Sequence, residues 1–180
     1  AAARRSCERR KTVRVPLTAD ISASLTLFDE EHDWLIGCQR NATSQYGEDG
    51  LINAVFQRIG IANRWCFEVG ASDGEVNSNT KTLRDEGWNA ILIESDPELF
   101  VKLHHFSDSR TECVNEHVTD SNLERILSDL QAPVDMVLGV IDVDGLDYWV
   151  WHGLKTIKPR VMLVEYAFWN PPQHVPPRAG

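Results

Sequence analysis

Five short apolar runs alternate with helical patterns along most of this chain, and this alternation restricts the fold more than any other feature. The runs cover residues 65–69, 90–93, 111–115, 136–141 and 161–164. Continuous apolar runs of this length are typical of strands that are buried on both faces. Strands that are separated by helices indicate a mostly parallel sheet with helices on both of its faces. The sequence therefore predicts an α/β fold.

The segments between these runs carry the helix signals. Helices are predicted over residues 79–86, 97–105, 121–130 and 146–157, and another precedes the first strand. In that first helix, Leu51, Ile52, Val55, Phe56 and Ile59 recur at steps of three and four residues. We expect Ser44 to cap this helix and Gly60 to end it, and we expect Ser121 to cap the fourth.

Charge and proline content suggest where the folded domain begins and ends. The first 14 residues hold six basic residues and one acid, although the whole chain has a formal net charge of −9. We expect residues 1–43 to be a basic, loosely structured leader or the remnant of a targeting peptide. Residues 44–172 are then the folded domain, and residues 173–180 are a proline-rich tail.

The acidic body of the chain also limits its partners and its location. A nucleic-acid partner favours a basic surface, so we expect none. No apolar run reaches the 18 residues that a membrane span needs. The four cysteines lack C-x-x-C spacing, which is consistent with a reducing compartment, and we expect a cytoplasmic location. The oligomeric state is not predicted.

The turn after the first predicted strand has the pattern E-x-G-x-x-x-G, formed by Glu68, Gly70 and Gly74. Glycine at position 70 lets the backbone turn tightly and lets a ligand approach closely. Dinucleotide sites bring a pyrophosphate to this turn and use a different glycine spacing. An acid at position 68 would repel a pyrophosphate. It suits S-adenosylmethionine (SAM), which carries an ammonium and a sulfonium group.

Polar residues follow the other predicted strands as well. Glu94 lies 20 residues beyond Gly74, where an acid can accept both ribose hydroxyls of an adenosyl group. Asn115 follows the third strand and could face the adenine edge. We expect these side chains to lie at one rim, because ligands bind at the carboxyl ends of parallel strands.

Three acids follow the fourth and fifth strands. Asp142 and Asp144 could bind the amino end of SAM, orient a substrate proton or hold a divalent metal. Glu165 could share a substrate or a metal with Asp142. We expect Asp147 to serve the start of the following helix, and we assign no residue to a metal.

Several segments together resemble FkbM-type methyltransferases. They are S-Q-Y-G-E-D-G at 44–50, F-E-V-G-A-S-D-G at 67–74, S-N-T at 78–80, G-W at 87–88, L-I-E at 92–94, I-D-V-D-G-L-D-Y-W at 141–149 and V-E-Y at 164–166. The resemblance implies a class I, Rossmann-like fold that uses SAM and transfers its methyl group, usually to an oxygen. It also implies a sheet of seven strands, of which this sequence predicts five.

The resemblance gives each matching residue an expected role. By position, Glu68, Gly70 and Gly74 would line the methionine end of SAM, Glu94 would bind the ribose, and Asp142 would lie near the transferred methyl group. Ala71 and Asn79 belong to the same block, and with Asn115 they complete the expected cofactor residues.

The sequence therefore predicts a SAM-dependent methyltransferase that acts on a hydroxyl of a small molecule or glycan. Asp142 or Glu165 would be the catalytic base. One alternative is a metal-dependent glycosyltransferase, in which Asp142 and Asp144 form a D-x-D motif. Another is a non-catalytic module that keeps the fold as a binding scaffold.

Overall fold

A computed structural model describes residues 33–166 of the chain. These residues form two compact units. Residues 33–42 and 46–60 make the smaller unit, and residues 43–45 with 61–166 make the larger one. The expected basic leader, up to residue 32, and the proline-rich tail lie outside the described residues.

The smaller unit contains a 3-10 turn, η2 (Asp33–Leu35), and one helix, α1 (Glu48–Ile59). In chain order the larger unit contains β1 (Trp65–Val69), α2 (Lys81–Asp85), β2 (Asn89–Glu94), α3 (Pro97–Leu103), η3 (His104–Phe106), β3 (Thr111–Asn115), α4 (Leu123–Asp129), β4 (Leu138–Ile141), α5 (Asp147–Gly153) and β5 (Val161–Val164). No helix in residues 33–166 is both long and apolar enough to cross a membrane.

The five strands form one parallel sheet in the order β3-β2-β1-β4-β5. The chain starts in the middle at β1, moves outward through β2 to β3, and then crosses back to β4 on the other side of β1. In the register of the sheet, Glu68 of β1 lies between Leu92 of β2 and Val140 of β4. This reversal of direction between β1 and β4 is the switch point at which α/β sheets bind ligands. The predicted α/β fold with a parallel sheet is confirmed.

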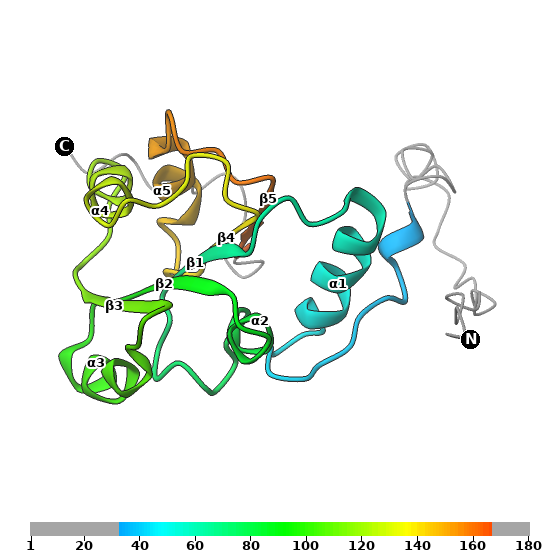
Figure 1. Cartoon of the computed structure of the whole chain (residues 1–180), viewed down its shortest axis with the longest axis horizontal. Coiled ribbons are helices and arrows are strands. Elements are labelled where there is room, and N and C mark those ends of the chain that lie inside the picture. The colour runs from blue at the N-terminus through cyan, green and yellow to red at the C-terminus, as the bar shows by residue number, and fades with distance from the viewer. Residues whose placement is uncertain (1–32, 167–180) are drawn as a thin grey trace, which may run out of the picture. The chain divides into compact units, whose positions relative to one another are not determined.

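Helices cover both faces of this sheet, with α4 and α5 on one side and α2 and α3 on the other (Figure 1). On the α4–α5 side, Phe67 and Ile93 of the sheet belong to one buried cluster with Leu127 and Val150 of the helices. Successive side chains of a strand point to opposite faces. Because Phe67 and Val69 belong to that cluster, Glu68 points to the opposite face.

The predicted strands at 65–69, 111–115 and 161–164 coincide with β1, β3 and β5. β2 extends the predicted 90–93 by one residue at each end, and β4 begins two residues later than the predicted 136. There the amide of Met136 donates to the carbonyl of Pro133 in a turn, instead of joining the ladder.

The two predicted N-caps are wrong. Gly47 is the N-cap of α1, with φ 100°, so Ser44 lies three residues too early; Gly60 ends that helix as predicted. Asn122 is the N-cap of α4, and its carboxamide accepts the amide of Thr119 instead of a helix amide. Before α4, the hydrogen bonds of Thr119 and Asn122 hold a turn, and the helix begins after it.

The helix predicted over 146–157 ends at Gly153 because the following residues bind another side chain. The amides of Lys155, Thr156 and Ile157 all donate to the carboxylate of Glu124 in α4, at 2.5–3.1 Å. Hydrogen bonds from Thr156 lower the pKa of Glu124 to about 2. These hydrogen bonds, formed between residues far apart in the sequence, override the local helix pattern.

We predict that Leu127→Ala lowers the free energy of unfolding by about 2–5 kcal/mol, because it leaves a cavity in the cluster between α4 and the sheet. Val101→Ala is the matched control, since Val101 is also helical but is 62% exposed; its effect should stay within about 0.5 kcal/mol. Urea unfolding followed by circular dichroism measures both values. Equal losses for the two variants would contradict the assigned core.

Candidate functional site

One cavity of about 420 Å³ lies at the carboxyl ends of β1, β2, β3 and β4. Its walls come from residues 68–72 and 76–78 at and after the end of β1, 93–95 at the end of β2, 116–118 after β3 and 142–144 after β4. Gln45, Leu99 and Leu146 complete the lining. The volume is in the range of small-molecule and cofactor pockets, and the place is the switch point of the sheet.

Acidic residues dominate the charged side chains that line this cavity. Five carboxylate residues line it: Glu68, Glu94, Glu116, Asp142 and Asp144. His117 is the only basic side chain among the described lining residues, and none of them is Lys or Arg. Low-dielectric walls with charges of one sign favour ligands of the opposite sign. The cavity therefore favours a ligand that carries positive charge.

Glu68 lines this cavity, but its carboxylate is almost fully buried and is occupied by the loop after β1. It accepts hydrogen bonds from the hydroxyl of Ser78 at 2.8 Å, the amide of Asn79 at 2.8 Å and the hydroxyl of Thr80 at 2.5 Å. Burial raises the pKa of Glu68, and these three hydrogen bonds act in the opposite direction. The geometry gives Glu68 the role of holding the loop that forms one wall.

The two glycines of the E-x-G-x-x-x-G pattern have different surroundings. Gly70 lines the cavity with φ 77°, and a Cβ at this position would overlap the backbone carbonyl oxygen of Asp142. Only glycine therefore lets β1 and β4 approach each other at this end of the sheet. Gly74 has φ 80° and is not a lining residue. A Cβ there would lie 2.7 Å from Leu103 and 3.0 Å from Phe106, so Gly74 serves packing against α3 and η3.

Glu94 ends β2 and lines the cavity while its carboxylate braces two loops. One oxygen accepts the amide of Ser72 at 2.8 Å, and the other accepts the amide of Asp96 at 2.8 Å. The oxygen that binds Asp96 also accepts the hydroxyl of Ser95 at 3.5 Å. A carboxylate offers about four lone-pair positions, so the oxygen that binds Ser72 keeps the capacity to accept a further donor. The geometry is compatible with a hydroxyl-bearing ligand that approaches from the cavity side.

Asn115 and Asn79 do not line the cavity. The side-chain amide of Asn115 donates to the backbone carbonyl oxygens of Glu94 at 2.7 Å and Ser95 at 3.3 Å. It therefore connects the end of β3 to the end of β2. The next residues, Glu116 and His117, provide the lining at this strand end. Asn79 is 8% exposed, and its backbone amide binds Glu68.

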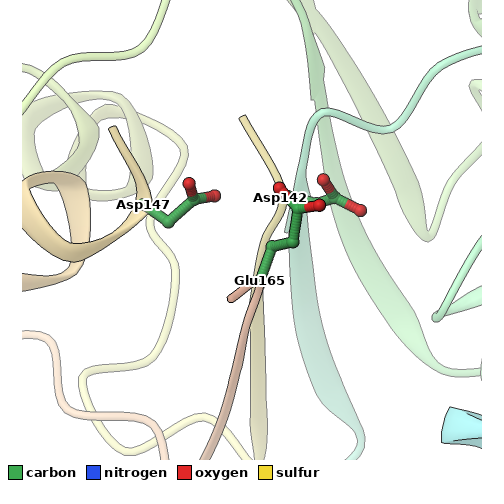
Figure 2. A group of neighbouring side chains, drawn as sticks. All are labelled: Asp142, Asp147 and Glu165. Atoms are coloured by element: carbon green, nitrogen blue, oxygen red, sulfur yellow. The ribbon is translucent and has the colours of Figure 1, made fainter. Parts of the chain in front are cut away.

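Asp142, Asp147 and Glu165 place one carboxylate oxygen each within 4.8 Å of one another (Figure 2). Asp142 follows β4, Glu165 follows β5, and Asp147 begins α5. Asp142 lines the cavity and Glu165 does not. Burial, followed by the charges of Asp142 and Asp147, raises the pKa of Glu165 to about 7. Three carboxylates this close can share a proton or be bridged by a cation.

The third member of this group has a structural task of its own. The two oxygens of Asp147 accept the amides of Val143 and Gly145, each at 2.8 Å. Asp147 therefore fixes the loop between β4 and α5, and it also lies in the first turn of α5, at the helix start that the sequence suggested. Asp144 lines the cavity but does not belong to the close group. The partners of Asp142 in the close group are therefore Asp147 and Glu165.

Sequence reasoning missed several lining residues, chiefly Gln45, Ser72, Glu116 and His117. A signal for part of the site is backbone conformation. Ser72, Asn77 and Asp144 have φ between 52° and 59°, and all three line the cavity. Non-glycine residues with a left-handed backbone conformation are costly and cluster at functional sites.

Comparisons with family models, curated proteins and solved structures give no match for this chain.

We predict that Glu68→Ala lowers the free energy of unfolding by about 2 kcal/mol or more, because it leaves three buried donors without an acceptor. Glu68→Gln keeps one acceptor oxygen and should lose less. Glu112→Ala, on the exposed side of β3, is the control and should change stability little. Urea unfolding measures all three variants, and a Glu68→Ala variant as stable as the control would contradict the loop-holding role.

Proposed function

We propose that this chain binds SAM in the acidic cavity and transfers its methyl group to a hydroxyl of a small molecule or glycan. The observation that carries the proposal is the cavity itself: it lies at the switch point of a parallel sheet, five carboxylates line it, and its described lining has no Lys or Arg. A phosphate-bearing cofactor would meet mostly acidic side chains there, whereas the sulfonium and ammonium of SAM suit it. The motifs that resemble FkbM-type methyltransferases point to the same ligand.

The expected binding residues divide by position around the cavity. Glu94 would accept the ribose hydroxyls with the capacity that its two backbone partners leave. Gly70 and Ala71 would let the donor lie close to the backbone. Asp142, next to Gly70, would lie near the sulfonium. These assignments place the donor across the ends of β1, β2 and β4.

The donor supplies an electrophilic methyl group, and the protein supplies position and a proton acceptor. Most of the rate in such a transfer comes from holding the hydroxyl in line with the carbon–sulfur bond. Asp142 lines the cavity, and its carboxylate would take the proton of the hydroxyl. The carboxylate of Glu165 lies close to that of Asp142, and its charge would influence whether Asp142 holds a proton.

The alternatives have less support from the site. A glycosyltransferase would need a cation to offset the diphosphate of its nucleotide sugar, and Asp144 does not join Asp142 in the close group. A Mn²⁺-dependent thermal shift with a nucleotide sugar, absent with SAM, would favour that class. A binding scaffold would bind SAM without turnover.

We predict that SAM binds the full chain in isothermal titration calorimetry and that Glu94→Ala weakens binding at least tenfold, which corresponds to about 1.4 kcal/mol. Glu98→Ala is the matched control, because Glu98 is an exposed acid near the same strand end that does not line the cavity. Circular dichroism checks that both variants are folded. The absence of SAM binding by the unchanged chain would reject the proposed function.

We also predict that SAM affinity rises between about pH 6 and about pH 8, by about threefold or more. The pKa of Glu165 is raised to about 7, so this side chain is mostly neutral below that pH and negative above it. The added charge beside Asp142 attracts the sulfonium. Glu165→Gln should flatten the profile, and S-adenosylhomocysteine, whose sulfur is neutral, should depend less on pH. Equal pH profiles for the two ligands would contradict this role of Glu165.

A further inference from the structure

The acidic side chains of the cavity would repel the one negative group of SAM, its α-carboxylate. SAM has a carboxylate in addition to its two positive groups, and the decarboxylated form keeps only the positive ones. The described lining offers no Lys or Arg to pair with that carboxylate, and His117 is its one basic side chain. On charge alone, such a cavity would bind decarboxylated SAM more tightly than SAM itself. Selection of the natural donor therefore favours neutral hydrogen-bond donors in the wall, in addition to His117.

The glycine-rich turn has few donors left for this task. The amides of Gly70 and Ala71 both donate to the carbonyl of Ile93, at 3.0 and 3.1 Å. The amide of Ser72 donates to Glu94, and that of Val76 donates to Asp73. These amides therefore take part in hydrogen bonds within the protein, whereas in phosphate-binding turns free amides face an anion.

Gln45, whose side chain ends in a primary amide, lines the same cavity although it lies in a distant part of the sequence. Residues 43–45 belong to the larger unit, although residues 33–42 and 46–60 do not. The hydroxyl of Thr43 donates to the carbonyl of Ser78 at 3.0 Å, and Ser44 is buried with 6% exposure. This short segment is therefore anchored to the loop that Glu68 holds, and Gln45 lines the cavity.

We infer that Gln45 is a donor-binding residue whose side-chain amide binds the α-carboxylate of SAM. The inference rests on the proposed function. A carboxamide has two N–H donors, which can bind a carboxylate. Because it is uncharged, it leaves no unpaired charge in the cavity when the ligand is absent. It also gives a task to the S-Q-Y-G-E-D-G segment, which the methyl-transfer scheme leaves unused.

The test compares SAM with decarboxylated SAM by isothermal titration calorimetry, using the full chain and two substitutions at Gln45. Gln45→Ala should weaken SAM binding about tenfold, because it removes a hydrogen bond to a charged group, and it should leave decarboxylated SAM within about twofold. Gln45→Glu should weaken SAM further and should bind decarboxylated SAM at least as tightly as the unchanged chain, because a new carboxylate repels one ligand and attracts the other.

Asn77→Ala is the matched control, since Asn77 is another carboxamide that lines the cavity. Its substitution should affect the two ligands equally. The inference is overturned if Gln45→Ala weakens both ligands alike, if it weakens neither, or if Asn77→Ala alone produces the carboxylate-specific loss. These outcomes differ from failure of the proposed function, in which the unchanged chain binds neither ligand.

Discussion

The buried carboxylate of Glu68 is the interaction on which the arrangement of the site depends. Its backbone lies in the central strand, in register with Leu92 on one side and Val140 on the other. Its side chain accepts three hydrogen bonds from residues 78–80. The same acid therefore connects the middle of the sheet to the loop that forms a wall of the cavity. Because burying a carboxylate without partners is very costly, the loop and the strand stabilise each other.

The guanidinium of Arg84 reinforces this loop from the side of α2. It donates to the backbone carbonyl of Gly74 and to the hydroxyl of Ser78, and it lies 5.3 Å from the ring centre of Phe106. Its charge also lowers the pKa of Glu68, although less than the hydrogen bonds do. The loop after β1 is thus held at both ends, and a held loop keeps a cavity in shape without a ligand.

The acids around the cavity differ in what their oxygens contact. Glu68, Glu94 and Asp147 accept backbone amides, and each of them fixes a loop. Asp142 and Glu165 instead lie close to each other at the ends of neighbouring strands. Acids of the first kind set the shape of the site, and in the second pair Glu165 supplies charge that changes near neutral pH. In the proposed reaction the second pair affects both the affinity for SAM and the proton transfer.

The sequence by itself determined the five strands, their parallel α/β arrangement and the gathering of Glu68, Glu94 and Asp142 at one edge of the sheet. These features follow from local apolar runs and from the rule that parallel strands end on the same side. Only the tertiary structure decided that the Glu68 carboxylate holds a loop, that Glu124 ends α5 at Gly153, and that Gln45 lines the cavity. Each of these depends on hydrogen bonds or contacts between residues far apart in the chain, which no local pattern specifies.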